Sequence, residues 1–329
     1  CPSTHKDRKP ERVAMSTTKK LRALISISLA AMLTFTLTAC AGGYGSDSNP
    51  KTSDYLYSKF SNGEFVDPYE TGKGDVGVTM ESMIQLSAVG YDKSKFTKAI
   101  AWLVKNEDLI KSPGLQGEFI FASHALDFSD DAIVAKKLKQ LKSSITAKGV
   151  VKETNNFSYC WVILGLMAAG EKELANRVAL QLATQNESSG GYKYIYGDSK
   201  SEEAADVTAF VVQAIKSTVN TGNESDEATK MLIAGRAKVW INRNKQDGNY
   251  WKAFGAYDIS GTAYAAMAYR TLEQDSSPYS DYLKTKINKK SNGLIASWTE
   301  PDADIFSTSQ AILALNNLNF IDILKNKVK

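Results

Sequence analysis

The feature that most constrains the fold is a series of helical segments that are apolar on nearly every side. Four clear examples are Tyr159 to Leu166, Val207 to Ile215, Thr262 to Tyr269 and Thr308 to Leu315. A helix without a polar face must be buried all round, so these segments are expected inside the molecule. They alternate with amphipathic segments such as 134–145, whose apolar residues Val134, Leu138, Leu141 and Ile145 share one face. The amphipathic helices are therefore predicted to lie outside.

The apolar segments share one register along the chain. Its first position is occupied in turn by Thr79, Phe119, Tyr159, Thr208, Thr262 and Thr308, at spacings of 40, 40, 49, 54 and 46 residues. A period of this size indicates a repeat architecture with one helical hairpin per repeat. Six residues after that position the side chain is small in five of the six repeats, as at Gly165, which predicts close helix packing.

Six hairpins with fully buried inner helices are expected to close into a ring. We therefore predict an all-α protein, an α/α toroid of about six helical hairpins over residues 55–329. The alternative is an open helical solenoid, which would expose its inner row of helices along a concave face and would favour more polar residues there.

The amino-terminal part of the chain has a different pattern. Residues 1–14 are polar and precede Met15, as in an over-extended start, and residues 15–39 begin with a cationic stretch. An uncharged apolar run follows over 23–37. Such a run is too short to span a bilayer as a helix, so residues 15–39 are predicted to be a signal peptide that is removed after export.

The end of this segment, Leu37-Thr38-Ala39-Cys40, resembles the lipobox of bacterial lipoproteins. The resemblance implies diacylglycerol on Cys40, a flexible tether over 40–54, and a location on the outer face of the cytoplasmic membrane, in the cell envelope. The alternative is an ordinary signal peptide followed by a chance cysteine, although exported chains seldom leave cysteines unpaired. Cys160, within an apolar helix, is expected to be buried.

The charge of the chain argues against nucleic-acid binding. The formal charge is +4, but residues 1–39 hold seven Lys/Arg against two Asp/Glu, which leaves −1 on the remainder. That remainder has no basic cluster with interleaved aromatic residues.

A loop motif precedes four of the apolar helices, over 148–159, 190–208, 247–262 and 292–308. Each stretch has a glycine or asparagine turn, an aromatic segment and a polar residue at the helix start. The pattern resembles the repeats of the terpene cyclase and protein prenyltransferase superfamily, most clearly from about Gly149 onward. This resemblance implies a toroid fold. It leaves the function open because the superfamily also includes cobalamin carriers and exported members of unassigned role.

The metal chemistry of that superfamily does not transfer to this chain. Protein prenyltransferases bind zinc through an Asp, a Cys and a His. Here Cys40 is expected to be lipidated, Cys160 to be buried, and His124 to be a core or rim histidine on a predicted helix. We therefore predict no metal site and no cofactor, and we expect no hydrolase triad based on His124.

The acid motif of squalene-type cyclases is only partly present. Of its DxDDTA pattern, residues 204–209 keep one aspartate, Asp206, with a threonine and an alanine. We expect Asp206 to be a helix N-cap, worth about 1 kcal/mol. Catalysis by Asp206, or by the pair Asp302 and Asp304, is the alternative.

Seven acidic residues are expected on loops at one end of the ring, where a glycosidase would need two carboxylates about 5 to 9.5 Å apart. They are Glu202, Glu203, Asp206, Asp258, Glu300, Asp302 and Asp304. The sequence does not pair them, and a solvated acidic loop is the simpler interpretation.

Aromatic residues in the same loops are candidates for ligand binding, because rigid rings with polar tips suit an apolar or sugar-bearing ligand. They are Tyr192, Tyr194, Tyr196, Trp251, Phe254, Tyr257 and Trp298. The structural alternative is that they wedge the hairpins together.

Three hypotheses of function follow. The first is a non-catalytic, membrane-anchored lipoprotein that binds a ligand or acts as an accessory subunit of an integral membrane protein complex. The second is an enzyme that acts on a polyprenyl lipid or glycan at the membrane surface. The third is a carrier of a corrinoid-type cofactor.

Overall fold

A computed structural model describes residues 46–152 and 155–325. The chain divides into two compact units, 1–41 and 42–329, and all described residues belong to the second. The predicted signal peptide and Cys40 lie outside the described residues. In the part that is described, no helix is both long and apolar enough to cross a membrane.

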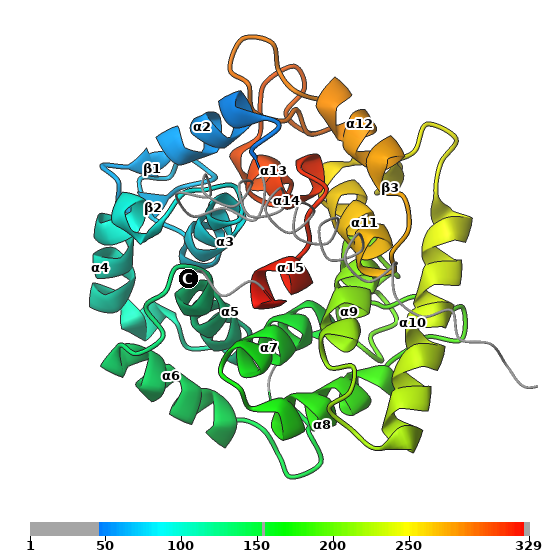
Figure 1. Cartoon of the computed structure of the whole chain (residues 1–329). Coiled ribbons are helices and arrows are strands. Elements are labelled where there is room, and N and C mark those ends of the chain that lie inside the picture. Colours follow the sequence, from blue (N-terminus) through cyan, green and yellow to red (C-terminus); the bar gives the residue numbers. More distant parts are fainter. Residues whose placement is uncertain (1–45, 153–154, 326–329) are drawn as a thin grey trace, which may run out of the picture. The chain divides into compact units, whose positions relative to one another are not determined.

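The inner helices form a ring, drawn in Figure 1. They are α3 (Val76–Ser87), α5 (Pro113–Ala125), α7 (Asn156–Ala168), α9 (Ala205–Ser217), α11 (Ile259–Thr271) and the pair α13 (Ile305–Ser309) and α14 (Ile312–Leu315). Buried residues occupy nearly every position of α9 and α11, as expected for helices without a polar face. The predicted α/α toroid is confirmed.

The outer helices surround this ring, and all but the first connect successive inner helices (Figure 1). They are α2 (Pro50–Ser58), α4 (Thr97–Lys105), α6 (Ala132–Ser143), α8 (Lys172–Ala183), α10 (Glu224–Asn244) and α12 (Ser277–Thr285). Two short 3-10 helices flank α4. Helix η1 (Lys93–Phe96) precedes it, and η2 (Glu107–Leu109) follows it. Two antiparallel hairpins lie in the connections, β1 (Phe60–Ser61) with β2 (Phe65–Val66), and β3 (Trp251–Ala253) with β4 (Ala256–Asp258).

The ring closes where the first inner helix meets the last. Oε1 of Gln85 in α3 accepts a hydrogen bond of 2.7 Å from the backbone N–H of Leu313 in α14. A continuous helix would direct that N–H to the carbonyl four residues earlier. The expectation of one helix over Thr308 to Leu315 is therefore wrong in this detail, because a break separates α13 from α14.

Helices α5 and α7 pack at the distance that small residues allow. A Cβ added to Gly165 would lie 2.4 Å from the carbonyl oxygen of Gly117, and a Cβ on Gly117 would lie 2.5 Å from that of Trp161. The backbones of the two helices are thus in direct contact, as the small residue at position 165 predicted.

The register threonines have a common structural role. In four repeats the threonine Oγ1 accepts the backbone N–H of an extended residue in the preceding connection. The pairs are Val66 with Thr79 (2.9 Å), Tyr192 with Thr208 (2.9 Å), Trp251 with Thr262 (3.2 Å) and Leu294 with Thr308 (2.9 Å). In the third repeat the Tyr159 hydroxyl accepts from Val151 N in the same way. Each connection is thereby fixed to the helix that follows it.

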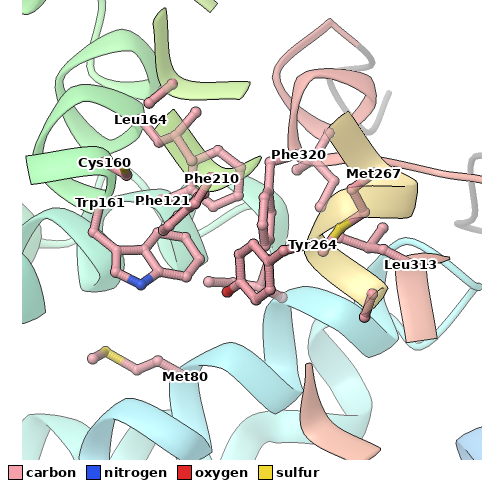
Figure 2. Packing of buried hydrophobic residues seen from close by; sticks show 14 of the residues in the cluster. Met80, Phe121, Cys160, Trp161, Leu164, Phe210, Tyr264, Met267, Leu313 and Phe320 are labelled. Atoms are coloured by element: carbon pink, nitrogen blue, oxygen red, sulfur yellow. The ribbon is translucent and has the colours of Figure 1, made fainter. Parts of the chain in front are cut away.

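The last helix, α15 (Phe320–Lys325), enters the middle of the ring (Figure 1). Figure 2 shows Phe320 among aromatic residues of the inner helices. Its ring centroid lies 5.1 Å from that of Trp161, 5.3 Å from that of Phe210 and 6.0 Å from that of Tyr264. Helix α15 therefore fills the axis of the ring with an apolar core.

The amino end of the described residues is attached to the carboxyl end of α14. The backbone N–H of Ser48 donates to Oδ1 of Asn316 over 2.7 Å, and Nδ2 of Asn49 donates to the carbonyl oxygen of Leu315 over 3.0 Å. The carboxyl ends of the inner helices and the start of α2 thus lie at the same end of the ring.

Candidate functional site

A cavity of about 1220 Å³ opens at the amino ends of the inner helices. Residues from the first turns of α3, α5, α7, α9, α11 and α13 line it. The connections that the register threonines hold in place form the wall of the cavity around its mouth. All six repeats therefore contribute to one site.

Two glutamates lie deep in this cavity, Glu81 of α3 and Glu118 of α5, and each is about 95 % buried, with 5 % and 4 % of its surface exposed. Oε1 of Glu81 accepts from the Tyr264 hydroxyl over 2.7 Å, and Oε2 accepts from Nε2 of Gln310 over 3.3 Å. Glu118 has no hydrogen-bond partner or ion pair among the described residues, and it belongs to the cavity lining.

Burial raises the pKa of both carboxyl groups above the usual range of glutamate. For Glu118 the negative charges of Glu81 and Asp75 raise the pKa further, so it rises well above the ordinary value. A carboxyl group of this kind keeps its proton near neutral pH and is a hydrogen-bond donor rather than only an acceptor.

Asp258 and Asp206 form a second acidic pair in the cavity wall. Asp258 is the N-cap of α11, with Oδ2 accepting from Gly261 N over 3.0 Å. Burial, together with the negative charge of Asp206, raises the pKa of Asp258 to about 7. Burial also raises the pKa of Asp206.

The expectation that Asp206 caps its helix is wrong. The N-cap of α9 is Ala204, and Asp206 lies two residues inside the helix. Its carboxylate accepts hydrogen bonds from the Tyr194 hydroxyl and from Val207 N, and its side chain lines the cavity. Asp206 is therefore not the N-cap, although it still accepts one backbone N–H of the first turn, and its side chain is part of the cavity wall.

The remaining acidic candidates separate into two groups. Glu202 and Glu203 line the cavity, whereas Glu300, Asp302 and Asp304 are not part of its lining. Asp304 is the N-cap of α13, with Oδ2 accepting from Ser307 N over 2.7 Å, and Asp302 is exposed. The structure does not bring the pair Asp302 and Asp304 to the site.

The aromatic candidates also separate. Tyr194, Phe254, Tyr257 and Trp298 line the cavity. Tyr192 and Trp251 are buried wedges, whose hydroxyl and indole N–H donate to the carbonyl oxygens of Leu182 and Ile241. Tyr196 is exposed and lies outside the lining.

Sequence reasoning missed Glu81 and Glu118, although a signal was present. Each is the only Asp, Glu, Lys or Arg in a helix that is almost entirely buried. A buried carboxyl group without a cation is costly, which makes such a position a candidate for function.

The described residues contain no cluster of three or more His, Cys, Asp or Glu that could hold a metal ion. His124 is half-buried and lines a separate hollow at the carboxyl ends of the inner helices. Cys160 is buried and unpaired, as expected.

No family model and no curated protein sequence matches the chain. Solved structures match it in fold. The unsaturated glucuronyl hydrolase of Bacillus sp. GL1 has a TM-score of 0.59 and 13 % identity, over 82 % of this chain and 94 % of that chain. The type II terpene cyclase MstE from Scytonema has a TM-score of 0.58 and 13 % identity, over 84 % and 97 %.

Haptocorrin, solved in complex with Cbi, has a TM-score of 0.56 and 15 % identity, over 86 % of this chain and 71 % of that chain. At these identities the likeness establishes the fold alone. The chain is a terpene cyclase-like α/α toroid, a class that includes enzymes and a corrinoid carrier.

Proposed function

We propose that this protein is a membrane-anchored enzyme of the cell envelope that cleaves a glycan in the toroid cavity, with Glu118 as general acid. The observation that carries the proposal is Glu118, a buried residue of the cavity lining that has no hydrogen-bond or ionic partner among the described residues. A residue that served only the fold would be expected to have its buried polar atoms paired.

The carboxyl groups around the cavity supply the two roles that glycoside cleavage requires. Glu118 donates its proton to the glycosidic oxygen as the bond from that oxygen to the anomeric carbon breaks. Water adds to the anomeric carbon, and the carboxylate of Asp206 or Asp258 accepts the proton that the water loses. The raised pKa values of Glu118 and Asp258 suit an acid and a base that work near neutral pH.

The cavity lining favours a glycan over a polyprenyl chain. The lining contains aromatic side chains such as Trp161 and Tyr257 together with hydroxyl and carboxyl groups, among them those of Ser112, Ser158 and Ser260. A polyprenyl chain could not pair with these polar groups, whereas the hydroxyl groups of a sugar could. The fold neighbour from Bacillus sp. GL1 is described as responsible for the degradation of glycosaminoglycan, which supports the same substrate class.

The proposed location rests on the lipobox-like segment that ends at Cys40. Replacing Cys40 with serine removes the thiol that would carry the lipid. We expect the wild-type chain to fractionate with membranes and Cys40→Ser to be released into the soluble envelope fraction. Equal membrane association of both would contradict the lipid anchor, and an unchanged glycan activity would show that the two parts of the proposal are independent.

The activity is tested by incubating the full chain with neutral and uronate-containing oligosaccharides and measuring the release of reducing ends. General acid catalysis contributes about 10²- to 10⁴-fold in rate. We therefore expect Glu118→Gln to lose at least 100-fold in kcat, with the exposed Asp302→Asn as the matched control. Equal turnover by wild type and Glu118→Gln would overturn the proposal. Retention of oligosaccharides without any turnover would favour a non-catalytic binding protein.

A further inference from the structure

The tip of the β3–β4 hairpin has an unusual residue at its turn. Ala253 pairs with Ala256, so Phe254 and Gly255 form a two-residue turn. Both have positive φ, 50° and 81°, as in a type I′ turn. That turn favours Asn-Gly, because a bulky side chain is strained in the left-handed region.

The Phe254 side chain gains no packing in return for this backbone conformation. Its relative exposure is 103 %, yet the residue belongs to the cavity lining. Trp298, in the loop 296–299, also lines the cavity and is 59 % exposed. Two large aromatic side chains therefore stand in solvent at the mouth of the same cavity.

A hydrogen bond and a cation–π contact of Tyr257 connect the hairpin that bears Phe254 to neighbouring segments. The hydroxyl of Tyr257, in β4, donates to Oε2 of Glu300 over 3.2 Å. Nζ of Lys286 lies 3.6 Å from the centroid of the Tyr257 ring. These contacts attach β4 to Glu300, two residues after Trp298, and to Lys286 at the end of α12. A support attached in this way lowers the entropic cost of binding at the mouth.

We infer that Phe254 and Trp298 form an outer glycan-binding subsite, so that the substrate is an oligosaccharide that extends from Glu118 to the cavity mouth. The inference rests on the proposed function and adds a requirement for chain length. Flat aromatic rings bind the apolar faces of sugar rings without needing a charged group. Contact between Phe254 and the glycan would explain why the strained backbone conformation of this residue is kept beside the cavity.

The test compares labelled oligosaccharides of two and of six sugar units, from both chitin and chondroitin, by fluorescence anisotropy. Phe254→Asn introduces the residue that the turn prefers, so we expect its melting temperature to equal or exceed that of the wild type. Trp298→Ala is the second variant. Met231→Ala is the matched control, since Met231 is 68 % exposed on α10 and lies outside the cavity lining.

We expect each rim variant to lose at least tenfold more affinity for the six-unit glycan than for the two-unit glycan, and Met231→Ala to bind as the wild type does. Equal losses for both lengths, or none, would overturn the outer subsite. If rim variants behave as the wild type while Glu118→Gln abolishes turnover, the outer subsite alone fails. If no oligosaccharide binds or is cleaved, the proposed function fails as well.

Discussion

The backbone N–H of Tyr192 donates a hydrogen bond of 2.9 Å to Oγ1 of Thr208, and the carbonyl oxygen of Tyr192 accepts from Ala204 N. Two bonds thus attach one residue of the connection to the start of α9. This connection bears Tyr194, and α9 bears Asp206, which the Tyr194 hydroxyl contacts. The repeat that builds the toroid therefore also positions a wall of the cavity.

Thr208→Val is expected to lower the free energy of unfolding by about 1–3 kcal/mol, because it leaves the buried Tyr192 N–H without an acceptor. Thr208→Ser keeps the hydroxyl group and is the control. Urea denaturation measures both. A valine variant as stable as the serine variant would contradict the role assigned to this hydrogen bond.

Phe320→Ala should destabilise the ring from its centre. The substitution empties the space between Trp161, Phe210 and Tyr264, and comparable truncations cost about 3–5 kcal/mol. Phe320→Leu fills most of that space and should cost much less. Thermal denaturation of the two variants would show equal losses if α15 did not contribute to the core.

Two glycine-to-alanine substitutions should have opposite effects. At Gly165 the added Cβ would lie 2.4 Å from the Gly117 carbonyl oxygen, so the variant must separate α5 from α7 and lose stability. At Gly235, on outer helix α10, nothing lies within 4 Å of the added Cβ. There alanine should raise the free energy of unfolding by about 0.5–1 kcal/mol. Urea midpoints of the two variants that moved in the same direction would disprove this account.

The buried carboxyl groups predict a stability that falls as pH rises. Burial raises the pKa of Asp258 from the ordinary 3.8 to about 7. The folded state then binds more protons than the unfolded state between about pH 4 and pH 7, so the free energy of unfolding decreases with pH across that window. Denaturation at pH 5 and pH 8 should therefore give a higher value at pH 5, and Asp258→Asn should reduce the difference.

Glu118→Gln should separate activity from stability. The amide needs no proton to remain neutral in the cavity, so at pH 8 the variant should exceed the wild type in free energy of unfolding. At pH 5 the difference should shrink. A variant that lost stability at pH 8 would indicate that Glu118 supports the fold instead of the chemistry.

The repeat and the ring could be predicted because they depend on periodicity. Apolar helices that recur every 40 to 54 residues in one register indicated equivalent helices. The structure gives the four threonines of that register equivalent bonds. The site could be predicted only in part. In a helix buried on every side, periodicity does not tell which residue faces the axis, so Glu81 and Glu118 were missed.

Asp206 illustrates a second reason. Its position before an apolar helix is that of a cap, but the N-cap lies two residues earlier, at Ala204, and a difference of that size changes the role of the side chain. For the aromatic candidates, the direction of each side chain decides its role. Trp251 is buried in the core, whereas Phe254, three residues later, is exposed at the cavity mouth.

The bond between Ser48 and Asn316 determines which way the molecule presents its cavity. It holds the start of α2 at the carboxyl ends of the inner helices, whereas the cavity opens at their amino ends. The first described residues therefore lie at the end of the ring opposite the cavity mouth.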